Sequence, residues 1–271
     1  MTTKSATLWP RGNRVAVTLS FDFDAETLWL SRNPENEKRP VLLSHGAYAY
    51  KVAIPRILEL LRRHRIPSTF FIPGWVAERH PGLVKEIQRQ GHEVGHHGYL
   101  HEHPHTLIES EEREILKKGI EILEGILGEK PKGYRSPAWE YSSRTLSLLS
   151  EYGFLYTSAM MDDELPYQYD SGLIELPVQW LLDDACFFLF SPTQPISRVI
   201  APPEWVFSIW KNEFDGFYKD GHYYLLTMHP QYIGRPHRIQ MLEKLIRHIK
   251  RQKKVWFARC IDVAEFWTSK K

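Results

Sequence analysis

Histidine and aspartate occur in two short stretches of this sequence at spacings that suit a metal ion. The stretch HEVGHHGYLHEHPH, residues 92–105, holds six of the thirteen histidines, and SFDFDAE places Asp22 and Asp24 two residues apart. His97 and His101 could both face one ion, and Asp24 would complete a His-His-Asp face with positions open for water. We therefore expect one divalent ion, most simply zinc, at these three side chains. The remaining histidines of the stretch are expected to make local structural contacts: His92, His96, His103 and His105.

The elements that must position these residues alternate between strand and helix. A β-branched run at 14–23 precedes a helical pattern at 50–66, and this rhythm is repeated along the chain. Six or seven strands separated by helices imply right-handed crossovers and a parallel sheet, hence a (β/α) barrel that need not close completely. Residues 28–48 and 185–201 lack periodicity and are expected to be long functional loops. Further strands are predicted at 67–74, 92–98, 132–139, 155–160, 172–182, 222–230 and 254–260, and further helices at 81–91, 110–128, 142–153, 203–221 and 238–252.

The residues suited to chemistry fall at the ends of predicted strands. In a parallel barrel the catalytic groups lie at the carboxyl ends of the strands. Asp22 and Asp24 close the first strand, where a separation of two residues points both side chains to one face. The histidine-rich stretch closes another strand, and Arg135 in GYRSPAW and His229 in HYYLLTMHP stand at two more. We expect all of them to converge on one end of the barrel.

Five motifs of this sequence resemble, in the same order, the motif regions of the polysaccharide deacetylase family, carbohydrate esterase family four: SFDFDAE, HGYLH, YRSPAW, ELPVQWLLDD and LTMHP. The resemblance covers at least residues 14–230. It implies an α/β fold, a distorted (β/α) barrel of the polysaccharide deacetylase type. It also implies metal ligation by an Asp and two His, which are Asp24, His97 and His101 here. The family's base would be Asp22 and its acid His229, with Arg135 orienting the base.

The sequence departs from the usual motifs of that family at two positions. Phe23 separates the two aspartates, which are adjacent in typical members, and Gly98 stands where Ser or Thr usually follows the first histidine ligand. These forms resemble a branch that includes the peptidoglycan deacetylase type of gastric bacteria, cyclic imide hydrolases and allantoinase-like proteins. Some allantoinase-like members lack the metal-binding aspartate. The presence of Asp24 therefore favours the metal-dependent subgroup.

The same residues account for hydrolysis on chemical grounds. A divalent ion held by two neutral imidazoles and one carboxylate lowers the pKa of its bound water towards ~7 and polarises an amide carbonyl. Asp22 could take the proton of that water, and Arg135 would keep Asp22 ionised. Amide nitrogen is a poor leaving group, so His229 would donate a proton to it. Asp183 of WLLDD is expected to orient or charge that imidazole, and the neighbouring Asp184 is the alternative for this role.

The sequence indicates the substrate less clearly than it indicates the metal ligands and the proton-transfer groups. A backbone N–H near Ala138 or Trp139 could stabilise the negative oxygen formed by attack on the carbonyl. A closed pocket is expected from the long segment 28–48 together with the aromatic segment ACFFLF. The aromatic segment could also form a subunit interface in a homo-oligomer. We therefore expect a small-molecule substrate, and hydrolysis of a non-peptide C–N bond in a small amide, cyclic imide or N-acetylated compound.

Three alternatives remain open from the sequence. The first is N-deacetylation of peptidoglycan or a chitooligosaccharide. The second is a catalytically inactive binding protein on the same scaffold. The third is a non-haem iron oxygenase, which shares the His-His-Asp face but is disfavoured by the alternating strands and helices.

Composition excludes several other classes. The 271 residues carry 35 basic and 33 acidic side chains, so nucleic acid and anionic membranes are not expected partners. A content of 42% hydrophobic residues can supply one large core, and without a repeat or linker we expect a single catalytic domain over residues 1–271. Cys186 and Cys260 are expected to be reduced core residues. Without a signal-peptide pattern or an apolar run of ~20 residues, we expect a cytoplasmic protein.

Overall fold

A parallel sheet forms the centre of the protein. The structure, a computed structural model, describes residues 9–190 and 200–270. The central strand β1, Val15–Asp22, is buried along its whole length, as expected for a strand covered on both faces. Along one edge β1 pairs in parallel with β8, Tyr223–Met228. Along the other it pairs in parallel with β9, Val255–Phe257, and then with β2, Thr69–Ile72.

From β2 the sheet continues through five shorter strands. Their order is β3, β4, β5, β7 and β6, and every pairing is parallel except that of β6 with β7. The described residues therefore form nine strands, of which the antiparallel edge strand β6 was not predicted. The bounds of these strands are Glu93–His96 for β3, Gly133–Tyr134 for β4, Tyr156–Thr157 for β5, Tyr167–Gln168 for β6 and Ile174–Glu175 for β7.

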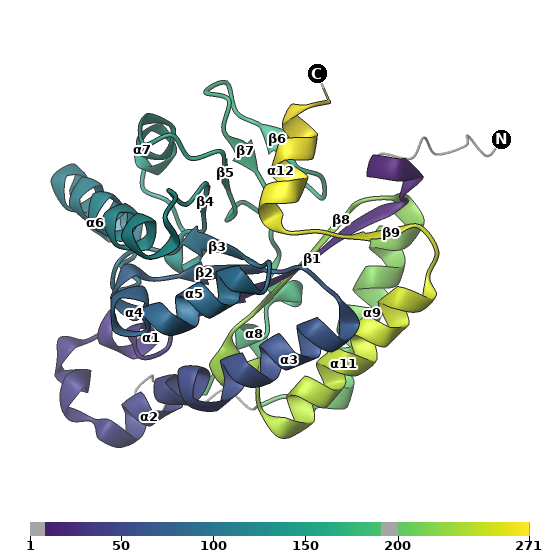
Figure 1. Ribbon diagram of the computed structural model, residues 1–271, viewed down its shortest axis with the longest axis horizontal. Coiled ribbons are helices and arrows are strands. Elements are labelled where there is room, and N and C mark those ends of the chain that lie inside the picture. The colour runs from purple at the N-terminus through teal and green to yellow at the C-terminus, as the bar shows by residue number, and fades with distance from the viewer. Residues whose placement is uncertain (1–8, 191–199, 271) are drawn as a thin grey trace.

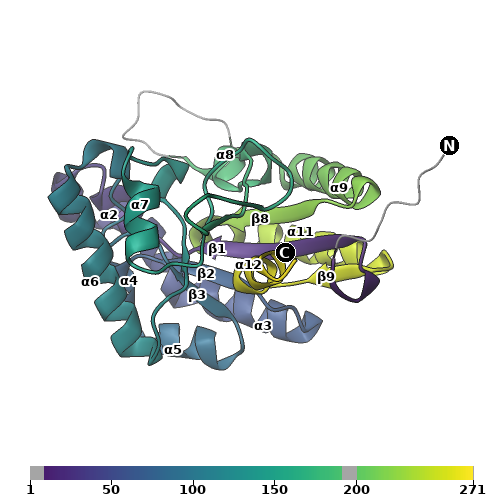
Figure 2. The same cartoon turned by 90° about the horizontal axis from the view of Figure 1, so that it is seen from above.

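Helices cover the sheet on its outer side (Figure 1). Figure 2 shows β1 and β2 between α9 on one side and α3 and α5 on the other. Several helices begin at proline in their first turn, where its missing N–H costs nothing, and α6 and α9 end at a glycine in the left-handed conformation. The bounds are Ile54–His64 for α3, Gly74–Arg79 for α4, Pro81–Arg89 for α5, Glu109–Leu127 for α6, Thr145–Glu151 for α7, Pro203–Asp220 for α9, Pro236–Arg251 for α11 and Cys260–Thr268 for α12.

The barrel is distorted because regular strand pairing does not close it. On the open side of β8 an irregular segment takes the place of a strand. Asp183 forms an isolated parallel bridge with Thr227, and the backbone N–H of Tyr223 donates to the carbonyl oxygen of Glu164 at 3.2 Å. These contacts confirm the predicted distorted, incompletely closed (β/α) barrel.

Two predicted loops contain helices instead. Residues 28–48 were expected to be irregular, but they lie largely in α1, Thr27–Leu30, a 3-10 turn at Pro34–Lys38 and α2, Pro40–Tyr48. Elements of four to nine residues are too short to produce a clear helical period. In the second predicted loop, residues 185–188 form α8, Ala185–Phe188, and residues 191–199 lie outside the described part of the chain.

Two predicted strands are shorter than expected. The strand expected at 132–139 stops at Tyr134 and is followed by a 3-10 turn, Pro137–Trp139, in which Ala138 and Trp139 have positive φ angles of 56° and 54°. The strand expected at 172–182 is limited to β7 and ends in another 3-10 turn, Trp180–Leu182. Both interruptions lie beside the candidate site.

No helix of the described residues is long and apolar enough to cross a membrane. Within the same part of the chain, Cys186 and Cys260 form no disulfide.

Candidate active site

The predicted site residues stand directly at the carboxyl ends of parallel strands. Asp22 is the last residue of β1, His97 follows β3, Arg135 follows β4 and His229 follows β8. Because these strands are parallel, their carboxyl ends meet at one edge of the sheet. All of these side chains are buried there.

Asp24, His97 and His101 form a compact cluster. The Nε2 atom of His97 lies 3.4 Å from Oδ1 of Asp24, and Nε2 of His101 lies 3.9 Å from Oδ2 of the same carboxylate. One ligand atom from each residue lies within 4.8 Å of the others. Both carboxylate oxygens of Asp24 are fully buried and have no hydrogen-bond partner among the described residues. Buried acceptors normally find a partner, so these two unpaired oxygens fit a cation bound among the three side chains.

The protonation states of the cluster also suit a metal ion. Burial alone would raise the pKa of Asp24, but the charges of His101 and His229 and the close approach and charge of His97, whose Nε2 lies 3.4 Å away, outweigh it and lower the pKa to about 2. Burial lowers the pKa of His101 to about 3, so its imidazole is neutral at pH 7. A carboxylate and a neutral imidazole are the forms that ligate metals.

The orientation of His97 is fixed through its other ring nitrogen. Its Nδ1–H donates to the backbone carbonyl oxygen of Arg135 at 2.7 Å. The lone pair of Nε2 is therefore directed to the Asp24 side, the arrangement usual for a ligating histidine.

Asp22 forms a buried ion pair next to the cluster. Nη1 of Arg135 donates to Oδ1 of Asp22 at 2.8 Å, while Oδ2 of Asp22 lies 4.0 Å from Nε2 of His97. The guanidinium is itself fully buried and also donates to the hydroxyls of Ser20 and Ser158 at 2.8 and 3.1 Å. With three groups fixing it, Arg135 holds the Asp22 carboxylate in one orientation.

His229 also lies beside the cluster, and a carboxylate supports it. Its Nδ1–H donates to Oδ1 of Asp184 at 2.7 Å, and its Nε2 lies 3.7 Å from Oδ2 of Asp24. Burial alone would lower the pKa of His229, but the hydrogen bond to Asp184 and the negative charges of Asp183, Asp184 and Asp24 raise it well above its usual value. The imidazolium form required of a proton donor is therefore favoured.

Of the two carboxylates between which the sequence did not decide, Asp184 and not Asp183 forms the hydrogen bond to the imidazole of His229. Oδ1 of Asp183 is 3.5 Å from Nδ1 of His229 and accepts instead from the backbone N–H of Ala185 at 2.8 Å, at the start of α8. The motif WLLDD predicts two adjacent carboxylates, but the turn into α8 determines which of them forms a hydrogen bond with the imidazole of His229. Asp183, Asp184 and His229 also lie close enough to hold a metal. The strong Asp184–His229 hydrogen bond and the raised pKa of the imidazole favour a bound proton there.

A pocket of about 240 Å³ opens onto these groups. Asp22, His97, His101 and His229 line it, and Asp183 does so as well. The apolar wall includes Trp139 and Trp180, whose rings stack with centroids 4.7 Å apart.

The backbone donors expected for the oxyanion are only partly available. The N–H of Trp139 donates to the carbonyl oxygen of Ser136 at 3.0 Å, so this N–H is already used. Ala138 lines the pocket, and its N–H stays the candidate donor.

The other histidines of the stretch differ in role. The Nε2–H of His96 donates to the carbonyl oxygen of Leu116 and its Nδ1 accepts from the N–H of Gly98, so this ring is structural. His103, also expected to be structural, lines the pocket, and so does Arg32, which the sequence analysis did not single out. Nothing in the local sequence distinguishes Arg32 from the other cations of its segment.

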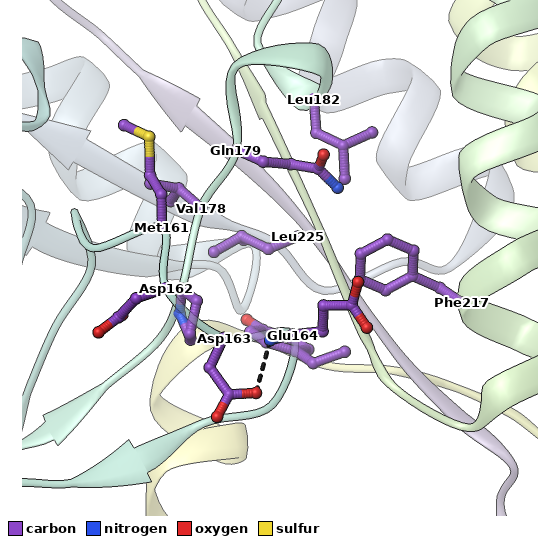
Figure 3. A pocket seen from close by; sticks show the side chains of 11 residues that line it. Met161, Asp162, Asp163, Glu164, Val178, Gln179, Leu182, Phe217 and Leu225 are labelled. Atoms are coloured by element: carbon purple, nitrogen blue, oxygen red, sulfur yellow. Dashed lines mark hydrogen bonds between the residues drawn. The ribbon is translucent and has the colours of Figure 1, made fainter.

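A second cavity, of about 410 Å³, lies near the beginning of β8 and not near its end (Figure 3). Leu225 of β8, Phe217 of α9 and the acidic run Asp162, Asp163 and Glu164 contribute to its lining. Glu164 pairs with Nδ1 of His222 at 2.7 Å. This cavity contains none of the residues predicted to act in chemistry.

Comparisons with known proteins agree with the geometry. The family description "Polysaccharide deacetylase" matches residues 34–157. The peptidoglycan deacetylase of Helicobacter pylori is 31% identical, over 93% of this chain and 95% of its own length. A crystal structure from Mycobacterium smegmatis, assigned to the polysaccharide deacetylases, is 40% identical with a TM-score of 0.92 over 97% of this chain and 93% of that one. The structure of an allantoinase is 25% identical with a TM-score of 0.86, over 99% and 95% of the two chains.

Proposed function

Because this chain belongs to the polysaccharide deacetylase family, whose members hydrolyse C–N bonds, we propose that it is a metal-dependent N-deacetylase of an acetylated amino sugar, as found in peptidoglycan or a chitooligosaccharide. The sequence alone favoured a small amide, cyclic imide or N-acetylated compound. The similarity to a peptidoglycan deacetylase over nearly the whole of both chains favours the carbohydrate alternative.

The observation that carries the proposal is the placement of two proton-transfer groups around one ligand set. Asp22, fixed by Arg135, lies beside His97, and His229, supported by Asp184, lies beside Asp24. Hydrolysis of an amide needs a base for the water and an acid for the leaving nitrogen, and the two groups meet these needs separately.

Asp24, His97 and His101 would hold a divalent ion, which when bound supplies an acidic water and polarises the acetamido carbonyl. Asp22 accepts the proton of the attacking water at its carboxylate, and the hydrogen bond from Arg135 holds that carboxylate in position. His229 donates the proton on Nε2 to the amine nitrogen as the C–N bond breaks. One water is consumed, and acetate and an amine are released.

The pocket supports a substrate that enters one ring at a time. Its volume of about 240 Å³ is just below the ~300–1,000 Å³ usual for small-molecule sites. The stacked Trp139 and Trp180 offer an apolar wall to the flat face of a ring.

Acetate release from a panel of N-acetylated compounds tests the proposal. The panel contains chitooligosaccharides, peptidoglycan fragments, succinimide-like rings and allantoin, and is assayed with metal-loaded protein and with the Asp22→Asn variant. Acetate from the acetylated sugars, lost in the variant, is expected. Turnover restricted to the rings or to allantoin would replace the proposal with the second candidate, a cyclic amide hydrolase, which the similarity to an allantoinase favours. No turnover of any compound would favour the inactive binding protein.

A further inference from the structure

Arg32 places a positive charge, unpaired among the described residues, at the pocket of the candidate active site. Its side chain is exposed and lines the same cavity as Asp22, His101 and His229. We propose that Arg32 binds a carboxylate of the substrate, so that the preferred substrate is an anionic N-acyl compound. This inference rests on the proposed deacetylase function and narrows its substrate class.

The backbone that carries Arg32 is held on both sides. Before it, the hydroxyl of Thr27 donates to the carbonyl oxygen of Asp24 at 2.6 Å, and Trp29 of α1 is almost fully buried. After it, the side-chain amide of the buried Asn36 donates to the carbonyl oxygen of Trp29 at 2.9 Å. The distance from the ligand Asp24 to the base of the Arg32 side chain is therefore set by the fold.

Two neighbouring cations of this segment have polar partners, whereas Arg32 has none within the part of the chain that the structure describes. Lys38 pairs with Glu35 at 2.7 Å, and Nη1 of Arg39 donates to the side-chain oxygen of Asn36 at 3.3 Å. Among residues 9–190 and 200–270, Arg32 forms neither an ion pair nor a side-chain hydrogen bond. Its five N–H donors are left for solvent or a ligand.

The other charged groups around the pocket leave the charge of Arg32 uncompensated. Asp22 is already paired with Arg135. Burial raises the pKa of Asp183 to about 7, which reduces its negative charge at neutral pH. His103 also lines the pocket, and an imidazole carries no negative charge that could compensate the guanidinium.

A guanidinium with free donors selects for a carboxylate, because two parallel N–H groups match its two oxygens. Two kinds of compound combine that group with an acetamide. One is an acetylated amino sugar that carries an acidic ether substituent, and the other is an N-acetyl amino acid. The shared recognition chemistry is a carboxylate within reach of Arg32 when the acetamide lies near Asp24.

The test compares matched neutral and anionic substrates. Each kind of compound is assayed as the free acid and as its neutral amide, with the metal-loaded wild type, Arg32→Gln and the control Arg39→Gln, whose side chain is outside the pocket. The wild type should prefer the acid by about 10-fold or more in kcat/KM, and added salt should weaken the preference. Arg32→Gln should lose the preference through KM while turnover of the neutral amide stays within about two-fold. The control should behave as wild type.

Equal kcat/KM for acid and amide in the wild type would overturn the inference while leaving the deacetylase function intact. So would an equal loss on both compounds in Arg32→Gln. If no compound is turned over, the inference is tested by binding alone. Calorimetry then measures the affinity of the Asp22→Asn variant for the free acid and the neutral amide of each compound. Equal affinity for acid and amide there would also overturn the inference. Which of the two acids binds better identifies the kind of compound.

Discussion

The backbone carbonyl oxygen of Arg135 accepts the Nδ1–H of His97 at 2.7 Å, while the guanidinium of the same residue donates to Asp22 at 2.8 Å. One residue thus orients a candidate metal ligand through its main chain and the candidate base through its side chain. A substitution of the side chain should therefore separate metal binding from catalysis.

Arg135→Lys should retain the metal and lose turnover. Lysine keeps a positive charge but cannot reach Asp22, Ser20 and Ser158 together, so Asp22 loses its fixed orientation. We expect kcat to fall by ~10²-fold, about the contribution of a general base. Steady-state kinetics and metal content per chain are measured together. Asp22→Asn should give a similar loss, and the double variant should be little worse than either. A large loss of metal in Arg135→Lys would contradict this separation.

His97→Ala should remove both metal and activity. We expect one divalent ion per wild-type chain and a large reduction in the variant, because one of three buried ligands is gone. Metal analysis of the purified proteins gives the stoichiometry, and a chelator should abolish wild-type activity until metal is returned. His105→Ala is the matched control, since this exposed histidine of the same stretch is outside the cluster. Equal metal in wild type and His97→Ala would exclude the assignment.

The site residues that were predicted best from the sequence are those that directly follow the end of a predicted strand. Asp24, His97 and Arg135 follow strands that the alternation of strands and helices predicts, so their convergence follows from parallel pairing alone. The sequence did not assign the roles of Asp184 and Arg32, because the orientations of their side chains depend on short helical turns. The prediction of a strand through Ala138 was wrong for the same reason. The positive φ angle of Ala138 depends on tertiary packing and is not indicated by the residue type.

Asp184→Asn should move the high-pH limit of turnover to lower pH. His229 can donate a proton only below its own pKa, which the hydrogen bond and charge of Asp184 help to raise against the effect of burial. Without that charge the pKa falls, so activity should be lost at a pH lower by ~1 unit or more as pH rises. The pH profile of kcat measures the shift. Asp183→Asn, which removes a carboxylate 3.5 Å away without a hydrogen bond, should shift the limit less. A larger shift in Asp183→Asn than in Asp184→Asn would mean that Asp183, and not Asp184, supports the imidazole of His229.

Gly46→Ala should weaken the metal site from a distance. Gly46 lies in α2, where a Cβ would overlap the backbone of Ala25 and Glu26, immediately after the ligand Asp24. Ala25 already has a positive φ of 48°, so the turn has little freedom to move aside. We expect a loss of ~1–3 kcal/mol in unfolding free energy, as for other overpacked sites, together with weaker metal binding. Denaturant unfolding and metal titration measure the two effects. Gly125→Ala is the control, because a Cβ there meets open space on the exposed side of α6, and it should be neutral or stabilising by up to ~1 kcal/mol. Equal metal affinity in the two variants would mean that the packing of α2 against the Asp24 turn does not position the ligand.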